Sequence, residues 1–262
     1  MAAEGKDFEQ IARAVAAEGY VLGAVVMDAV NFTPQSRPRL FIIGVAADSV
    51  LPNATHADLP SPAWHPDAVI RAYNRLPRAV QASWRWWQLA MPTRRAGTLD
   101  DILELEPKGV RWHTEHETQQ LLSMMTDVNR RKVMEAQRLG ALKAGTIYRR
   151  TRNNIQRAEV RFDGVAGCLR TPGGGSSRQT IMVVDGPSVR TRLISPREAA
   201  RLMGLPESYE LPPRYNDAYH LLGDGIVVPV VAHLRQHVLT PILLANAAKI
   251  TACEPAPRRW VA

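Results

Sequence analysis

The spacing of apolar residues predicts a helix and then two strands at the start of the chain. Apolar side chains recur at helical spacing over residues 7–17, and Gly19 follows where a C-terminal cap belongs. Two apolar runs come next, 20–30 and 40–45, and the polar segment 34–39 separates them. This order predicts an antiparallel pair of strands with residues 34–39 near its turn.

The middle of the chain alternates between irregular and helical patterns. Residues 46–62 are rich in proline, which predicts a link into a second module. Residues 66–90 have a helical pattern, and 83–87 hold three of the six tryptophans, which predicts a small aromatic core rather than stacking on bases. Residues 114–139 are the strongest helical candidate, with Gly140 directly after them.

The last third predicts a short capped helix and a longer terminal one. Ser195, Pro196 and Glu198 form the pattern of a capping box, with proline at the first helical position. Gly204 and Pro206 mark the end of that helix. The apolar run 226–231 then leads into a helical pattern that continues through Leu243.

Composition excludes several classes of protein. With 262 residues, of which 45% are hydrophobic, the chain is long and apolar enough to bury a core, so a mainly disordered protein is excluded. It has no uninterrupted apolar run near the roughly 18 residues of a membrane helix, and its first 30 residues lack the order of a signal peptide. We therefore expect a soluble, cytoplasmic protein with no membrane partner. Two cysteines, Cys168 and Cys253, are too few for a disulfide scaffold or a cysteine-rich zinc finger.

The basic charge is concentrated in one segment. The chain has a formal net charge of +8, and residues 130–178 alone hold 12 Lys and Arg against 3 Asp and Glu, which leaves the rest of the chain close to neutral. Such a segment either faces a polyanion or forms a solvated basic surface, and charge alone does not separate the two. If it faces DNA, the candidate contacts are Arg149, Arg150, Arg152, Arg170 and Arg178. The composition of residues 172–178 predicts a flexible loop.

Familiar catalytic and metal signatures are not found in the sequence. There is no GxxxxGK[ST] phosphate loop and no GxSxG elbow, and residues 223–225 supply only a GxG. His113 and His116 could lie one turn apart, but no third ligand is near them in sequence, so we expect them on a solvated helix surface and predict no metal site.

Three segments, in order and spacing, resemble the cytosine-C5 DNA methyltransferases. Gly19-Tyr20 and residues 28–44, with Pro34-Gln35-Ser36-Arg37-Pro38-Arg39 in their middle, look like motif VIII with its PQxRxR core. Residues 192–206 are similar to motif IX, and residues 223–230 are similar to motif X. The basic segment lies between them, where that family keeps its variable target-recognition domain. The motifs cover only residues 19–44 and 190–231, and the middle matches mainly by position and charge.

The resemblance implies a fold and a division into parts. It implies an α/β fold: the C-terminal part of an AdoMet-dependent, Rossmann-like methyltransferase domain with an inserted mixed α+β target-recognition domain. Residues 1–46 would carry the motif VIII hairpin and residues 47–189 the recognition domain. Residues 190–262 would return to the catalytic domain with motifs IX and X.

The resemblance also assigns roles to individual residues. Arg39 would stabilise negative charge on a flipped cytosine, and Gln35 and Arg37 would bind and organise the pocket around that base. Asp224 and Gly225 of motif X would contact S-adenosyl-L-methionine (AdoMet). The alternatives are that Arg37 and Arg39 are ordinary edge-strand charges and that residues 223–225 form only a tight turn.

Some positions depart from the family pattern. Motif X usually reads Gly-Asn, and Asp224 replaces that asparagine. In motif IX, Ser195, Met203 and Leu205 replace threonine, glutamine and phenylalanine but keep the cap and the apolar character. The glycine-rich AdoMet loop, the Pro-Cys nucleophile and the Glu-Asn-Val segment that the family carries before motif VIII do not occur in this sequence, and neither cysteine follows a proline.

These features predict a subunit of a split enzyme. The chain would be the DNA-recognition subunit of a DNA (cytosine-5)-methyltransferase, inactive alone and associated with the nucleoid. A second chain would supply the Pro-Cys nucleophile and most of a shared AdoMet site, and double-stranded DNA would be the substrate. The alternatives are a catalytically inactive DNA-binding or regulatory protein derived from such an enzyme and a fragment of a single-chain enzyme. The DNA target and a role in restriction, phage defence or regulation stay open.

Overall fold

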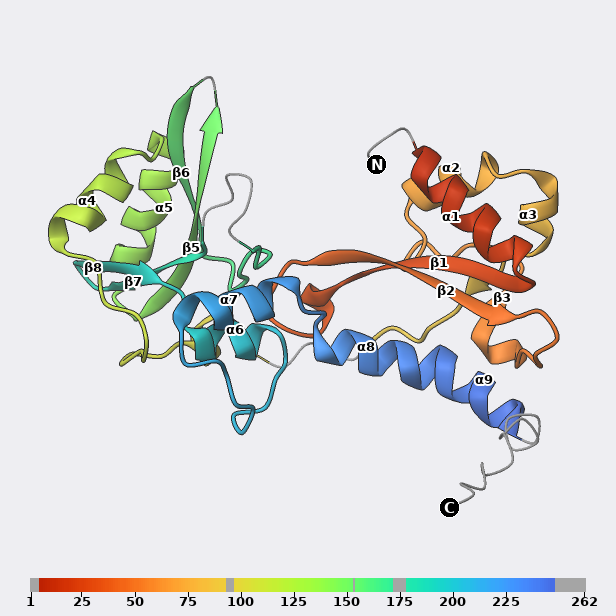
Figure 1. The fold of residues 1–262 in the computed structure, drawn as a ribbon. Helices are drawn as coiled ribbons and strands as arrows, with labels where there is room; N and C mark the ends of the chain where they lie inside the picture. The colour runs from red at the N-terminus through yellow and green to blue at the C-terminus, as the bar shows by residue number, and fades with distance from the viewer. Residues whose placement is uncertain (1–4, 93–96, 153, 172–177, 248–262) are drawn as a thin grey trace, which may run out of the picture. The chain divides into compact units, whose positions relative to one another are not determined.

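The structure is a computed structural model, and it describes residues 5–92, 97–152, 154–171 and 178–247. The chain forms two compact units (Figure 1). Unit 1 contains Met1–Met27, Pro38–Met91 and Ala232–Ala262, and unit 2 contains Asp28–Arg37 and Pro92–Val231. Motif VIII therefore contributes to both units, because its turn belongs to unit 2 and its strands mainly to unit 1.

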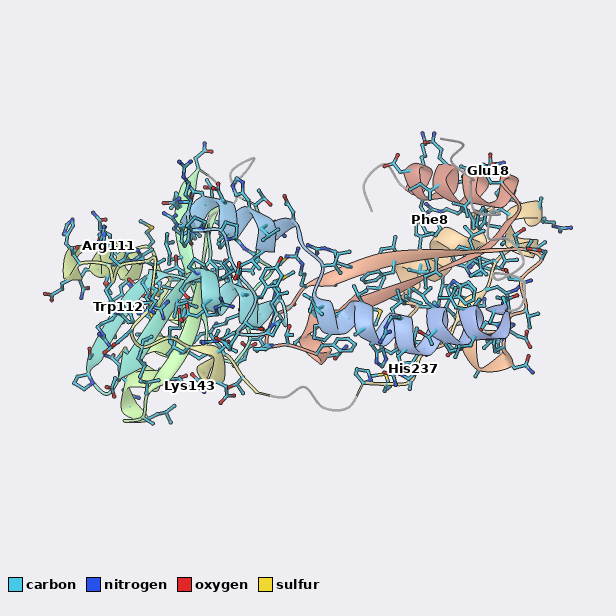
Figure 2. The ribbon with its side chains drawn as sticks, turned by 60° about the horizontal axis from the view of Figure 1, so that its bottom comes forward. Phe8, Glu18, Arg111, Trp112, Lys143 and His237 are labelled. Carbon is cyan, nitrogen blue, oxygen red and sulfur yellow. The ribbon has the colours of Figure 1, made fainter. Side chains whose placement is uncertain are left out.

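A helix and a two-stranded sheet begin unit 1, as the sequence predicts. Helix α1 (Lys6–Ala17) is followed by Gly19 with a φ of 77°, a left-handed conformation that favours glycine. Strands β1 (Tyr20–Asp28) and β2 (Pro38–Ala46) form the sheet. Helix α1 lies on one face of this pair, where Phe8 and Ala12 pack into a buried cluster with Leu22 and Ala24 (Figures 1 and 2).

An aromatic core completes this part of unit 1. The predicted helical region 66–90 contains two short helices, α2 (Asp67–Asn74) and α3 (Arg78–Ala82), and then strand β4 (Trp86–Trp87). Prolines at the N-caps of both helices divide the region, so the helical prediction is confirmed over 67–74 and 78–82. It is wrong beyond residue 82, where the chain leads into β4. Strand β4 pairs with β3 (His56–Ala57), which follows the 3-10 turn η3 (Asn53–Thr55). Trp84, Trp86 and Trp87 are 5%, 6% and 0% exposed, which confirms the predicted aromatic core.

The terminal helical pattern is confirmed as α8 (Val228–Leu234), a π-helical turn, η5 (Arg235–Leu239), and α9 (Thr240–Ala245). Leu234, Val238 and Ile242 recur every four residues and are buried. By length and composition, the run Tyr215–Ala245 could cross a membrane, because an 18-residue window within it has a mean hydropathy of 1.4. That test is weak evidence, since a core helix passes it too, and Asp217, Asp224 and Arg235 lie within the run.

Unit 2 is built on a four-stranded antiparallel sheet of order β6-β5-β7-β8. The strands are β5 (Lys143–Arg152), β6 (Ile155–Arg161), β7 (Thr180–Asp185) and β8 (Ser188–Leu193). Helices α4 (Glu115–Ser123) and α5 (Asp127–Arg138) cover one face, where Leu121 and Val133 pack against Ile147 and Met182 (Figure 1). The 3-10 turn η4 (Asp100–Ile102) precedes these helices along the chain.

The prediction of one helix over residues 114–139 is wrong, because two helices occupy this region. The chain leaves the helix at Met125, which forms an isolated β-bridge with Ala158. The Ala158 amide donates to the Met124 carbonyl at 3.1 Å, and Thr126 then becomes the N-cap of α5. Tertiary pairing with β6 overrides a helical pattern that was continuous in the sequence.

Two further helices carry motifs IX and X. Helix α6 (Pro196–Leu202) begins with the predicted capping box between Ser195 and Glu198, which is confirmed. Glu198 also forms an ion pair with Arg192 at 2.6 Å, and both side chains are buried at 1% and 0% exposure. Helix α7 (Tyr215–Asp224) follows. Residues 47–91 of the predicted recognition domain lie in unit 1, and 92–189 lie in unit 2.

Candidate active-site hub

The turn at residues 34–37, which we call the hub turn, is buried in unit 2. It follows the 3-10 turn η2 (Ala29–Asn31), whose N-cap Asp28 accepts a hydrogen bond from the Val30 amide. The same Asp28 carboxylate accepts from the Arg37 amide at 2.7 Å, which closes the loop across nine residues. One carboxylate therefore fixes both ends of the segment that carries the predicted pocket residues.

Gln35 connects the hub turn to two distant segments. Its side chain is 0% exposed, and its amide nitrogen donates to the Leu202 carbonyl at 3.0 Å, at the end of motif IX. Its amide oxygen accepts from the Leu169 amide at 3.1 Å. Since a buried amide side chain needs both donor and acceptor partners, these contacts satisfy Gln35 within the protein.

Arg37 holds three backbone carbonyl groups. Its guanidinium donates to the carbonyl oxygens of Leu169 at 2.5 Å, Gly223 at 2.6 Å and Gly225 at 2.8 Å. The side chain is 3% exposed. The last two acceptors lie at the C-terminal end of α7, where the helix dipole favours a cation. Arg37 therefore ties motif X and the 165–169 segment to the hub turn.

The 165–169 segment pairs with the hub turn through its backbone. The Ala166 amide donates to the Pro34 carbonyl at 2.8 Å, and the Ser36 amide donates to the Ala166 carbonyl at 2.9 Å. The half-buried Cys168 thiol lies 3.4 Å from an Arg37 nitrogen. Nothing in the sequence pattern singled out this segment, because its contacts are backbone groups that any residue type could supply.

Motifs IX and X also contact each other directly. Gly204 has a φ of 71°, and a Cβ atom at this position would overlap the ring of Pro229. The Val228 amide donates to the Met203 carbonyl at 2.9 Å. The hub turn, motif IX and motif X thus meet in one place within unit 2, although the hub turn lies more than 150 residues before motif IX in the sequence.

The predicted cofactor residues lie at the end of α7. The Asp224 side chain is exposed and accepts a hydrogen bond from the Thr171 hydroxyl. Gly225 is the C-cap of α7. A Cβ atom on Gly223 would come within 2.9 Å of the Thr171 amide nitrogen, so this close approach requires glycine.

Arg39 belongs to unit 1, whereas the hub turn belongs to unit 2. It is exposed in β2, within the part of the motif VIII segment assigned to unit 1, and one of its guanidinium nitrogens donates to the Pro38 carbonyl at 2.9 Å. The exposure of Arg39 contrasts with the burial of Gln35 and Arg37. Its predicted action on cytosine stays a prediction.

The predicted DNA contacts have different surroundings. Arg149, Arg150 and Arg170 are exposed, and the side chain of Arg152 lies outside the described residues, as does Cys253. Arg178 instead packs over the Tyr215 ring at 5.5 Å and donates to Asn216 at 2.6 Å. Sequence reasoning did not select Arg157 as a DNA contact, although it is directly opposite Arg150 in the sheet.

Burial raises the pKa of two tyrosines in α7, Tyr215 and Tyr219. The Tyr219 hydroxyl accepts from the Gln179 amide at 3.0 Å, and Tyr215 stacks on Tyr219. Both phenols therefore stay neutral at physiological pH, so they contribute packing and hydrogen bonds rather than charge.

One cavity of unit 2 is lined by residues outside the hub. This cavity of about 870 Å³ is lined by residues of α4, α5 and the β7–β8 turn, including His113, Arg130 and Arg190, and no predicted site residue lines it. Within the described ranges, no group of three or more His, Cys, Asp or Glu side chains could hold a metal ion. His116 bonds instead to Gln120, one turn along α4.

A known protein family matches most of the chain, including the three motif segments. The family described as C-5 cytosine-specific DNA methylase matches residues 2–240. The chain therefore belongs to the C-5 cytosine-specific DNA methylase family, and its fold is that of an α/β methyltransferase domain. Members of this family generally use AdoMet as the methyl donor.

Individual relatives match over part of their length. The chain is 36% identical over 76 residues to the type II methyltransferase M.HhaI of Haemophilus parahaemolyticus and 29% identical over 69 residues to M.NlaX of Neisseria lactamica. These segments cover 29% and 26% of this chain and 22% of each relative. The crystal structure of the S. pombe Dnmt2 methyltransferase matches with a TM-score of 0.47 and 17% identity, covering 90% of this chain and 62% of that one.

Proposed function

We propose that this chain supplies target recognition, part of the base pocket and one wall of the AdoMet site to a DNA (cytosine-5)-methyltransferase. A second chain supplies the cysteine nucleophile and most of the AdoMet fold. The observation that supports this proposal is the hub, where Arg37 and Gln35 join the segments resembling motifs VIII, IX and X. Because these segments meet through buried side chains, the chain has the contacts needed to hold a pocket together.

Methylation of C5 requires the base to leave the duplex, since the enzyme cannot reach the reacting face within the base stack. AdoMet bound at the site supplies the methyl group that C5 takes after a cysteine thiolate has added to C6. Negative charge develops on the pyrimidine during that addition. The exposed Arg39 guanidinium is the group of this chain that stabilises it, because arginine stays protonated and presents directed donors.

Gln35 and Arg37 act as positioning residues in this proposal. Their side chains are committed to backbone groups of residues 169, 202, 223 and 225. They fix the turn that leads into Arg39. In this way they shape the pocket that binds the target base. A pocket held by buried hydrogen bonds loses little energy to reorganisation when the base enters.

Asp224 and Gly225 would hold part of AdoMet. The exposed Asp224 carboxylate, at the negative end of α7, suits the ammonium group of the methionine portion. The same carboxylate repels the methionine carboxylate, so we place only the ammonium beside it. The Thr171 hydroxyl, which donates to Asp224, orients the acceptor.

The nucleophile is assigned to a second chain because this sequence contains no Pro-Cys pair. Cys168 follows glycine and Cys253 follows alanine. The test is to purify the chain together with its neighbouring gene products and to assay transfer of a tritiated methyl group to DNA. Transfer by the assembled complex supports the proposal. Sequence-specific DNA binding without transfer by any such complex would favour an inactive DNA-binding or regulatory protein.

A further inference from the structure

Strand β8 is an outer strand of the unit 2 sheet, and Val189 turns both of its backbone groups away from that sheet. In the antiparallel register, Val189 is opposite Val184 and Thr191 is opposite Met182. The Thr191 carbonyl accepts from the His113 amide at 2.9 Å, so the Thr191 backbone faces the outer edge. Because the pairs of an antiparallel ladder alternate, the N–H and C=O of Val189 face the same edge. Among the described residues, neither group has a hydrogen-bond partner.

The outer edge of β8 is closed on both sides of Val189. On one side, the Gln137 side-chain amide donates to the Pro187 carbonyl at 2.8 Å. On the other side, Trp112 and Arg192 form an isolated antiparallel bridge. An exposed edge invites pairing with another chain, and these contacts restrict the open part to one residue. One donor and one acceptor therefore stay available at Val189.

The cavity of about 870 Å³ lies alongside this open edge, because Val189 is one of the residues that line it. Helices α4 and α5 form its other sides, and each turns one stripe of residues, spaced three and four apart, toward it. The apolar part of the lining consists of Leu122, Val133, Met134 and Val189. Met134 is 49% exposed, although it is apolar and lies beside the buried Val133. A volume of about 300 to 1,000 Å³ with an apolar lining and a few polar groups is typical of ligand sites.

The side chains that line the cavity carry charges of both signs. Arg130 lies one turn before Met134 on the same stripe of α5, and its ion pair with Asp127, at 3.8 Å between exposed side chains, is weak. Glu115 lines the cavity from the first turn of α4. Arg190 alternates to the opposite face of the sheet from Val189, where its guanidinium lies over an indole ring. The cavity therefore suits a partner with mixed charges better than a polyanion.

We propose that this cavity binds an extended peptide segment of a partner protein, which pairs with Val189 and places an apolar side chain against Met134 and an acidic one at Arg130. A residue of an extended peptide supplies both an acceptor for the Val189 N–H and a donor for its C=O, as in the addition of a strand to a sheet edge. A simple anion would satisfy the guanidinium but neither backbone group. The inference goes beyond the proposed function and needs neither DNA nor AdoMet.

Selection from a random peptide library displayed on phage, with the full 262-residue chain as the target, tests the inference. Fluorescence anisotropy then measures the affinity of a selected peptide for single variants. Met134→Lys should weaken binding at least about 10-fold, because it replaces the apolar contact with a charge. Val128→Lys is the matched control, since Val128 is an equally exposed apolar residue of α5 that does not line the cavity. It should leave the affinity unchanged.

The charge contact has its own matched pair of variants. Arg130→Ala should weaken binding about 2- to 5-fold, the range for an exposed ion pair. The same loss should follow when the acidic residue of the peptide is replaced by its amide, and the two changes together should add no further loss. Arg131→Ala removes the same charge from an exposed position of α5 outside the cavity and should have no effect.

A change in the peptide backbone gives a readout that does not depend on folding of a variant. Replacing one peptide amide at a time by an ester removes one N–H and keeps every side chain. Only the ester at the residue opposite Val189 should weaken binding, by about 2- to 10-fold, because one hydrogen bond is lost. Four results would overturn the inference: no selected peptide, equal weakening by Met134→Lys and Val128→Lys, no effect of any ester, or displacement of the peptide by duplex DNA.

Discussion

Arg37 and Arg39 are two positions apart, but their surroundings assign them different tasks. Arg37 is buried and bonded to three carbonyl oxygens, whereas Arg39 is exposed at the start of β2. A buried guanidinium whose donors are used by the protein supports structure, and an exposed one can act on substrate. We therefore predict that replacing Arg37 lowers the stability of the protein and that replacing Arg39 lowers the rate of the reaction.

Arg37→Ala should destabilise unit 2 strongly. The substitution leaves three carbonyl groups without their donor, and each unsatisfied buried group costs about 1 to 3 kcal/mol, so we expect a loss of about 3 kcal/mol or more. Urea denaturation measures the change. Arg39→Ala is the control, and as a surface substitution it should stay within about 0.5 kcal/mol of wild type. A loss below about 1 kcal/mol for Arg37→Ala would contradict its role in the hub.

Arg39→Ala should instead lower the chemical rate of the assembled enzyme. Loss of one donor to a developing charge typically costs about 10² to 10³ in rate, because the interaction is strongest in the transition state. Arg39→Lys should recover little, since an ammonium lacks the planar, directed donors. Single-turnover methylation at saturating DNA and AdoMet measures the rate. A nearly normal rate for Arg39→Ala would remove Arg39 from the reaction pocket and leave the edge-charge alternative.

Among the elements, the contact between α6 and the start of α8 depends on one glycine. Gly204→Ala should lower the free energy of unfolding by more than a positive φ alone would, because its Cβ atom would overlap Pro229. Gly186→Ala is a matched control with a φ of 53° and nothing within 4 Å of the added atom. We expect the control to lose about 1 to 2 kcal/mol of stability. Gly204→Ala should lose about 1 to 3 kcal/mol more. Equal losses in urea denaturation would contradict tight packing between motifs IX and X.

The basic elements of unit 2 should give DNA binding a steep salt dependence. Each phosphate contact contributes about 0.9 to the log-log slope of affinity against salt, so Arg149→Ala with Arg170→Ala should reduce the slope by about two units. Arg71→Ala with Arg78→Ala removes the same charge from exposed positions of unit 1 and should leave the slope unchanged. Fluorescence anisotropy with a mixed-sequence duplex measures both. An unchanged slope in the first variant would favour a merely solvated basic surface.

The sequence predicted those elements well whose start or end depends on interactions between residues close together in the chain. The capping box at Ser195 and the left-handed Gly19 were readable because side-chain chemistry and φ are set within a few residues. The break at Met125 was not readable, because it depends on a bridge to Ala158, 33 positions away in the chain. For the same reason the sequence named Gln35 and Arg37 but not Leu169, whose contribution is a backbone carbonyl.

At the scale of the whole molecule, the proposed enzyme divides its chemistry between chains. In this proposal, this chain contributes the hub and the basic sheet of unit 2, and a second chain contributes the nucleophile. Each of the two units is stabilised by a core of its own, the aromatic cluster around Trp84 in unit 1 and the cluster around Ile147 in unit 2. The division predicts that neither cysteine of this chain takes part in the reaction.

Transfer of a tritiated methyl group from AdoMet to duplex DNA tests this division most directly. The measurement compares the chain alone, the complex purified with its neighbouring gene products, and the same complex carrying Cys168→Ser and Cys253→Ser. We expect no transfer by the chain alone, transfer by the complex, and activity within a few fold of wild type for the double variant. Transfer by the chain alone, abolished by either serine substitution in a protein that still folds and binds DNA, would contradict the account.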